Sequence, residues 1–173
     1  MPVQMNAESR RVLLVDDHQF VRMALAHLLS EVRGVVGVDE AASLGDAVTA
    51  IGATRYDLVL LDLDLPDSTG LDSFFSLSAS CPEVAVAIVT GDCSVQIMAQ
   101  AMQAGARGFI AKTQSPGVIQ AAVALMLAGE RFVPASLYLA ENSRVPEDRG
   151  QTNRTTRMAT APDLAGLEEM LSP

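Results

Sequence analysis

The chain has 173 residues, 49% of them hydrophobic and 4% aromatic, and a formal net charge of -9. This length allows one well-buried domain with an appendage, but not two full domains. The negative charge argues against nucleic-acid binding by this chain itself, because duplex affinity comes from Lys and Arg that neutralise phosphates.

The sequence also predicts the cellular compartment of the protein. Residues 1–10 are polar and carry no apolar signal core, and no apolar run approaches membrane-spanning length. Cys81 and Cys93 show neither metal-site nor disulfide spacing. We therefore expect a cytoplasmic protein with reduced thiols and no membrane contact.

Short apolar runs alternate with helical periodicities between residues 11 and 129. In chain order we expect a strand at 12–15, a helix at 20–32, a strand at 35–38, a helix at 43–51, a strand at 58–61, a helix at 71–77, a strand at 84–89, a helix at 94–104, a strand at 108–111 and a helix from 116 to near 129. Strands and helices in alternation predict a parallel sheet covered by helices on both faces.

Four of the five expected strands end in an ionisable or hydroxyl residue. These residues are Asp16-Asp17, Asp62, Thr90 and Lys112, and Lys112 is the only lysine of the chain. In parallel α/β sheets, ligands bind outside the carboxyl ends of the strands. We therefore expect these side chains to converge on one site.

Three carboxylates in one pocket repel each other and need a cation, and all-oxygen ligation favours Mg2+. Asp17 and Asp62 are the expected direct ligands, Asp16 binds directly or through water, and a backbone carbonyl near Asp64 adds an oxygen. An aspartate held beside Mg2+ can act as a nucleophile toward a phosphoryl group.

The other polar groups have simpler interpretations. Lys112 offers a compact positive charge and Thr90 a hydroxyl donor for phosphoryl oxygens. His18 is interpreted as a partly exposed residue at a helix start and is left out of the site. Asp64 and Asp67 are expected to have solvated side chains in a loop.

These motifs together resemble the receiver domains of response regulators. The matching stretches are Leu14-Val15-Asp16-Asp17-His18, Leu60-Leu61-Asp62-Leu63-Asp64-Leu65-Pro66, Val89-Thr90-Gly91 and Phe109-Ile110-Ala111-Lys112. Val21-Arg22 and the segment 128–134, Ala-Gly-Glu-Arg-Phe-Val-Pro, are similar to the NarL/LuxR-type subfamily. The resemblance covers roughly residues 11–135.

The resemblance implies a flavodoxin-like (βα)5 doubly wound sheet of strand order 2-1-3-4-5. It implies phosphorylation of Asp62 by a histidine kinase and Mg2+ at Asp16, Asp17 and Asp62. It further implies a regulatory switch rather than an enzyme, in which Thr90 moves toward the phosphoryl group and Phe109 turns inward. The face of the fourth helix, fifth strand and fifth helix would then change, and a homodimer would form through it.

Two residues depart from the common pattern of the family. Thr113 follows the lysine, where many receivers have proline. Phe109 replaces the tyrosine of other receivers and has no hydroxyl to bond across an interface.

The resemblance and a change in composition after the receiver together set the expected domain boundaries. Residues 1–10 are expected to be disordered, 11–135 to form the receiver and 136–162 to form a linker. Residues 163–173 are expected to form a short helix or the start of a truncated helix-turn-helix domain, because Leu171-Ser172-Pro173 is similar to the beginning of such domains. The full-length protein would then bind DNA and control transcription.

Three alternatives remain. A stand-alone receiver would act through protein–protein contact alone, and a degenerate receiver would no longer accept phosphate. A haloacid-dehalogenase-like phosphatase would use Asp62-Leu63-Asp64 as its nucleophile motif. Pro66 and the position of the Asp16-Asp17 pair before that motif oppose the phosphatase.

Overall fold

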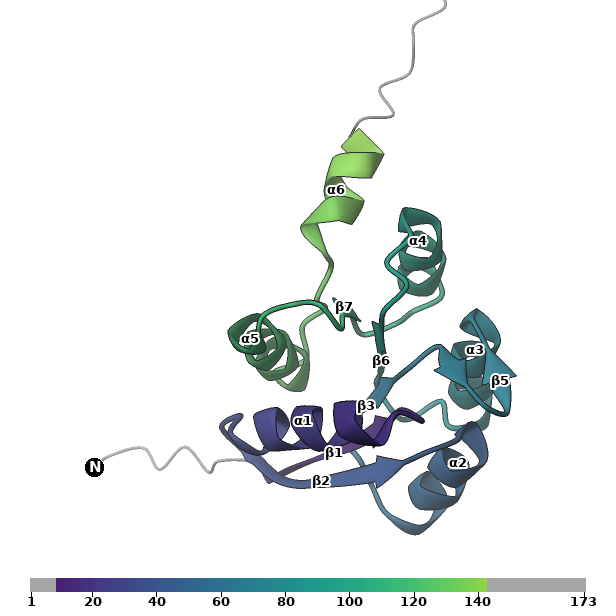
Figure 1. Ribbon diagram of the computed structural model, residues 1–173, viewed down its shortest axis with the longest axis vertical. Coiled ribbons are helices and arrows are strands. Elements are labelled where there is room, and N and C mark those ends of the chain that lie inside the picture. Colours follow the sequence, from purple (N-terminus) through teal and green to yellow (C-terminus); the bar gives the residue numbers. More distant parts are fainter. Residues whose placement is uncertain (1–8, 143–173) are drawn as a thin grey trace, which may run out of the picture.

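The computed structural model describes residues 9–142, which are built on a five-stranded parallel sheet (Figure 1). Its strands are β1 (Arg10–Val15), β2 (Val35–Ala41), β3 (Leu58–Leu61), β6 (Val86–Thr90) and β7 (Phe109–Ala111). Their spatial order is β2-β1-β3-β6-β7. Counted within the sheet alone, this is the expected order 2-1-3-4-5, and the flavodoxin-like fold is confirmed.

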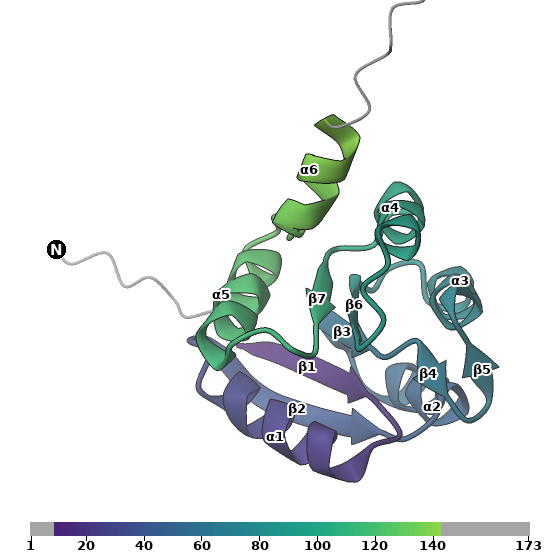
Figure 2. The same ribbon diagram turned by 45° about the horizontal axis from the view of Figure 1, so that its top comes forward.

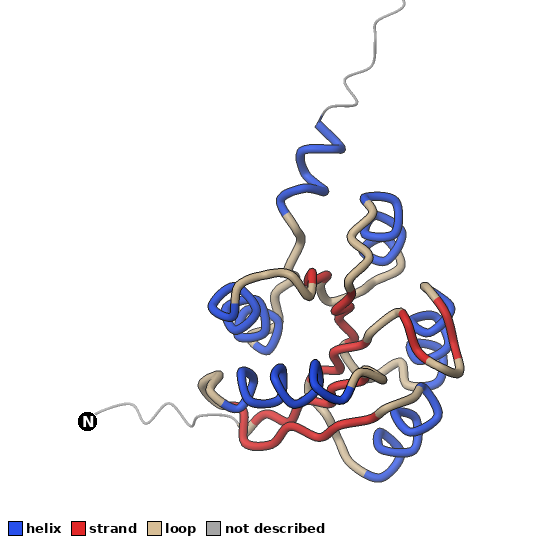
Figure 3. Tube along the Cα trace, viewed as in Figure 1, coloured by secondary structure: helices blue, strands red, loops and turns tan. Residues whose placement is uncertain are grey.

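Helices cover both faces of the sheet, as Figure 3 shows with helices in blue and strands in red. They are α1 (Gln19–Ser30), α2 (Leu44–Ala53), α3 (Leu71–Ser80), α4 (Val95–Gln103) and α5 (Pro116–Leu127). Buried residues of α1 and α5 share one hydrophobic cluster, and those of α2, α3 and α4 share the other. Because all strands of this sheet are parallel, their carboxyl ends lie at the same end of the sheet, between the two helix layers.

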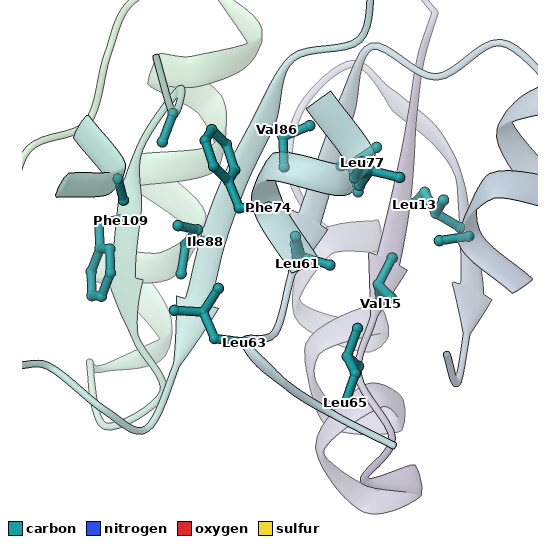
Figure 4. Close-up of a cluster of buried hydrophobic side chains, with 14 of the residues drawn as sticks. Leu13, Val15, Leu61, Leu63, Leu65, Phe74, Leu77, Val86, Ile88 and Phe109 are labelled. Atoms are coloured by element: carbon teal, nitrogen blue, oxygen red, sulfur yellow. The ribbon is translucent and has the colours of Figure 1, made fainter. Parts of the chain in front are cut away.

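The period of two along each strand divides the core between these layers. Leu13 and Val15 of β1 point to the α2–α3–α4 side, whereas Val12 and Leu14 belong to the α1–α5 side. Figure 4 shows the first of these clusters, which reaches from Leu13 at one end to Phe109 at the other. Because both faces are buried, the strands appear in the sequence as continuous apolar runs rather than as alternating patterns.

A small hairpin follows β3 and was not expected from the sequence. Its strands β4 (Asp64–Leu65) and β5 (Ser68–Thr69) pair antiparallel beside α3 (Figure 2). Two-residue strands are too short to produce a periodic pattern, so only the turn residues between them were recognisable.

The segment after α5 covers the outer side of strand β7. Phe109 N donates to Phe132 O at 3.2 Å, and Gly108 pairs with Phe132 in a parallel bridge. The chain then forms α6 (Ala135–Asn142), where a linker was expected from residue 136, and Leu137 of this helix is buried in the same cluster as Phe109. The approach at Gly108 is close, since a Cβ there would lie 3.0 Å from Phe132 O.

The remaining boundaries lie outside the described residues. These are residues 1–8 of the segment 1–10 that was expected to be disordered, the linker beyond residue 142 and the terminal segment 163–173, whereas Arg10 already belongs to β1. Within residues 9–142, no helix is long and apolar enough to cross a membrane.

Candidate functional site

The ends of four strands bring the predicted polar residues to one edge of the sheet. Asp16 and Asp17 follow β1, Asp62 follows β3, Thr90 ends β6 and Lys112 follows β7. Asp16, Asp62 and Thr90 are buried, which is uncommon for such groups unless they are paired or bound.

Backbone hydrogen bonds continue the ladders past the strand ends and fix these residues. Asp62 N donates to Val15 O at 2.8 Å, and Lys112 N donates to Thr90 O at 2.9 Å. Because β1 and β3 are neighbours, Asp16 and Asp62 come side by side. Lys112 starts two strands away from β3, and its long stem is needed to reach them.

Lys112 bridges the two buried carboxylates. Its Nζ lies 2.6 Å from Asp62 Oδ2, to which it donates a hydrogen bond, and 2.7 Å from Asp16 Oδ2. The second contact is an ion pair without hydrogen-bond geometry, so Asp16 Oδ2 is buried with no hydrogen-bond donor.

Burial and the contact between Lys112 and Asp62 shift the pKa values of these two residues in opposite directions. Burial raises the pKa of Asp62 above its usual value. The contact with Lys112 lowers this pKa in part, and the nearby Asp16 carboxylate raises it further. Burial by itself would lower the pKa of Lys112, but the contacts with Asp16 and Asp62 outweigh it, and the pKa is raised. Lys112 is therefore charged at neutral pH, and the Asp62 carboxylate is held in a partly desolvated position.

His18 lies in the acid cluster, although the sequence predicts a position outside the site. Its Nδ1 is 2.6 Å from Asp17 Oδ1 and 3.3 Å from Asp16 Oδ1, and its backbone N donates to Asp16 Oδ1 at 2.8 Å. The expected exposure is correct, since 58% of the side chain is accessible. A histidine directly after an acid pair was the available signal.

Arg22 is a second residue whose position the sequence did not reveal. Its guanidinium donates to the backbone carbonyl of Asp16 at 2.5 Å and to the Glu40 carboxylate at 3.2 Å. Arg22 thereby ties α1 and β2 to the acid cluster. Its charge is used to position Asp16, not to bind the Asp16 side chain.

Asp67 is exposed, as expected for a loop residue, but its carboxylate also has structural partners. Its two carboxylate oxygens accept from Leu44 N and Gly45 N, both at 2.9 Å, while Ser43 Oγ accepts from Asp46 N at 3.1 Å. These three donors are the unpaired N–H groups at the start of α2. The loop after Asp62 is thus fastened to α2.

We expect Asp67→Ala to lower the free energy of unfolding by about 1–2 kcal/mol at pH 7, because a charged cap is lost from a helix N-terminus. The backbone N–H groups of Leu44 and Gly45 hold the pKa of Asp67 below its usual value. An acid with a lowered pKa contributes stability that is complete above its unfolded pKa of about 3.9 and is lost as pH falls through the folded pKa. Urea unfolding of both proteins at pH 7 and pH 3 checks this, and a difference that persists unchanged at acid pH would contradict it.

A cavity of about 560 Å³ opens over this cluster. It is lined among others by Asp62, Lys112, Thr90, Asp64 and Asp92. Thr90 Oγ1 accepts from Asp92 N at 3.2 Å, which leaves its O–H free to donate. The expected phosphoryl-binding groups thus share one opening.

Phe109 does not line this cavity. It is fully buried on β7, packed in the cluster that includes Leu137. The ring that the family resemblance expects to turn inward on phosphorylation is therefore already buried in this structure.

The donor set fits a small divalent cation. Asp16, Asp17, His18 and Asp62 each offer a ligand atom, and these atoms all lie within 4.8 Å of one another. The buried carboxylates of Asp16 and Asp62 share the single positive charge of Lys112, so a divalent cation would neutralise the remaining negative charge of the group.

Comparison with known proteins gives consistent relatives. Residues 12–124 match the family described as "Response regulator receiver domain". The chain is 32% identical over 126 residues to "Response regulator UvrY" of Escherichia coli O6:H1, covering 73% of this chain and 58% of that protein. It is 35% identical over 126 residues to "Transcriptional activator protein ExaE" of Pseudomonas putida, covering 73% and 59%.

Solved structures show the same fold. A LuxR-family two-component response regulator from Aurantimonas sp. SI85-9A1 has a TM-score of 0.71 and 29% identity, with 79% of this chain and 99% of that chain covered. A LuxR-family DNA-binding response regulator from Silicibacter pomeroyi has a TM-score of 0.65 and 35% identity, with 73% and 98% covered. The chain spans less than two thirds of the UvrY and ExaE sequences. It belongs to the response regulator receiver domain family, in its NarL/LuxR-type branch.

Proposed function

We propose that Asp62 accepts a phosphoryl group from a histidine kinase and that the chain acts as a phosphorylation-controlled switch. The observation that carries this proposal is the contact of Lys112 Nζ with Asp62 Oδ2 at 2.6 Å and Asp16 Oδ2 at 2.7 Å, at the base of an open cavity. It joins a nucleophilic carboxylate, a fixed positive charge and a further acid at the position where phosphoryl-transfer charge develops.

The residues divide the chemistry between them. A carboxylate oxygen of Asp62 forms the new bond to phosphorus while the bond from phosphorus to the donor breaks and its electron pair leaves with the donor. The Lys112 ammonium and the Thr90 hydroxyl hydrogen-bond to phosphoryl oxygens. Asp16, Asp17, Asp62 and the backbone carbonyl of Asp64 would hold Mg2+, which supplies charge neutralisation and orientation of the phosphoryl oxygens.

The proposed readout is the face formed by α4, β7 and α5, which corresponds to the expected dimerisation face. Here the segment at Phe132 pairs with β7 and α6 packs near α4, so this edge of the sheet is partly occupied. Thr90 and Lys112 connect the pocket to β6 and β7 directly. A homodimer through this face would therefore include α6 in its surface or displace it.

We also propose that the full-length protein controls transcription through a DNA-binding domain. ExaE is described as a transcriptional activator, and the structure from Silicibacter pomeroyi as a DNA-binding response regulator. The alternative is a receiver that acts through protein–protein contact alone. The family match favours either one over the phosphatase alternative.

The test is intact-mass measurement after incubation with Mg2+ and acetyl phosphate. The wild type is expected to gain one phosphoryl group, and Asp62→Asn none. Asp64→Asn is the matched control, because Asp64 is an exposed carboxylate two residues further on whose expected ligand is its backbone carbonyl. Chelation of Mg2+ should abolish the gain.

No gain in the wild type would overturn the phosphoacceptor role and favour a degenerate receiver. A gain retained in Asp62→Asn but lost in Asp64→Asn would mean that the acceptor is Asp64.

A further inference from the structure

The imidazole of His18 faces the carboxylates of the proposed cation site. Its Nδ1 lies 2.6 Å from Asp17 Oδ1 and 3.3 Å from Asp16 Oδ1. The backbone of His18 is fixed as well, since its N–H donates to Asp16 Oδ1 and the residue is the N-cap of α1 with extended φ and ψ. Its side chain makes no capping hydrogen bond, so capping of α1 does not explain where the ring lies.

These separations are those of ligands on one ion. With metal–ligand bonds of about 2.1 Å, adjacent ligand atoms of a six-coordinate ion lie about 3.0 Å apart and opposite ones about 4.2 Å apart. The contacts of Nδ1 with the two aspartates bracket the adjacent distance, and the complete set of four ligand atoms lies within 4.8 Å. Small side-chain adjustments would bring all four onto one centre.

We propose that His18 Nδ1 is a ligand of the bound cation, so that this pocket prefers first-row transition ions such as Mn2+ or Co2+ over Mg2+. The inference rests on the cation site of the proposed function. A hard ion such as Mg2+ takes oxygen ligands and gains little from imidazole, whereas imidazole suits the transition ions. A neutral imidazole also adds a donor without adding to the negative charge of three carboxylates.

The competing explanation is that the ring N–H only hydrogen-bonds to Asp17 and orients it beside the ion. That arrangement would influence every divalent ion in a similar way and would place no nitrogen on the metal. The two arrangements differ in an observable that does not depend on phosphorylation.

The experiment uses Mn2+ as the probe and pulsed electron paramagnetic resonance to detect directly bound nitrogen. The chain has two histidines, so His27→Gln is the matched control. His27 lies near the end of α1, is 76% exposed and is 3.9 Å from Glu31. We expect a strong 14N coupling in the wild type and in His27→Gln, and its loss in His18→Gln.

Isothermal titration gives the second readout. We expect His18→Gln to raise the Kd for Mn2+ and Co2+ by at least about 10-fold, the scale of losses at metal-site partners. The Kd for Mg2+ should change by less than about 2-fold, because an exposed nitrogen donor adds little for this ion.

The outcomes separate this inference from the function on which it rests. Bound Mn2+ without 14N coupling, or equal losses for Mn2+ and Mg2+ in His18→Gln, would overturn the ligand role of His18 and leave the cation site standing. Failure of the wild type to bind any of these ions would overturn the cation site itself. Failure of Asp62 to accept phosphate while the 14N coupling is present would overturn the phosphoacceptor role alone.

Discussion

Replacing Lys112 with Met is expected to lower the free energy of unfolding by about 2–4 kcal/mol at pH 8 without divalent cations. The substitution keeps most of the apolar stem but leaves the buried carboxylates of Asp16 and Asp62 without their positive partner. Their side chains are only 1% and 2% exposed, so their negative charges are poorly solvated once the ammonium is gone. The Lys112 side chain is 18% exposed, which reduces the expected loss below that of a fully buried pair.

The pKa of Asp62 determines how the stability loss in Lys112→Met depends on pH. Burial raises its pKa, and loss of Lys112, which lowers it, should raise it further. An acid with a raised folded pKa contributes stability that is complete below its unfolded pKa, about 3.9, and is lost as pH rises through the folded pKa. The difference between Lys112→Met and the wild type should therefore be largest above the folded pKa of Asp62 and shrink as pH falls toward about 4.

Urea unfolding between pH 5 and pH 8 measures this difference. Lys112→Arg is the control that keeps the charge, and it should lose less stability than Lys112→Met. Saturating Mg2+ should also restore part of the loss in Lys112→Met, since a bound cation replaces the missing charge. A mutant as stable as the wild type at pH 8 would show that the three groups are not paired in solution.

Phe109→Ala should lower the free energy of unfolding by about 3–5 kcal/mol, a large part of the stability of a domain of this size. Phe109 is fully buried and belongs to the cluster that joins β7 to α4 and α6. Removal of the ring leaves a cavity at the edge of the sheet. Phe109→Leu, which keeps most of the volume, should cost less than about 1.5 kcal/mol.

Phe75→Ala is the matched aromatic control. The Phe75 ring is 47% exposed on α3 and makes one edge-to-face contact with Phe74, at a centroid distance of 5.8 Å. Its loss should cost about 1 kcal/mol. If Phe109→Ala costs no more than Phe75→Ala, the Phe109 ring is outward in the unphosphorylated protein. The inward movement expected from the family resemblance would then be available as a response to phosphorylation.

Most of the candidate site followed from the sequence. Asp16-Asp17, Asp62, Thr90 and Lys112 each follow or end a run of buried apolar residues. Parallel strands place their carboxyl ends at one edge, so residue order alone predicted that these side chains meet. The strand order itself came from the family resemblance and is confirmed by the structure.

Contacts made across the fold could not be read in this way. Asp67 is a residue type that is common in loops, so nothing in the local sequence indicates a partner. The two backbone N–H groups that it binds, at the start of α2, lie more than twenty positions earlier in the chain. The burial of Phe109 and the position of α6 depend on packing between α4, α6 and β7. No local pattern encodes such partners.

His18 shows the same difference within the site, between what the sequence predicts and what the packing decides. Its place after the acid pair was visible, but whether its ring faced solvent or the carboxylates depended on the start of α1 and the backbone bond to Asp16. Periodicity and residue type determine where elements begin, end and bury a face, because these are local properties of the backbone and of apolar burial. Distances of 2.6–3.3 Å between side chains were decided only by the tertiary structure, because they depend on how the strands and helices pack around them.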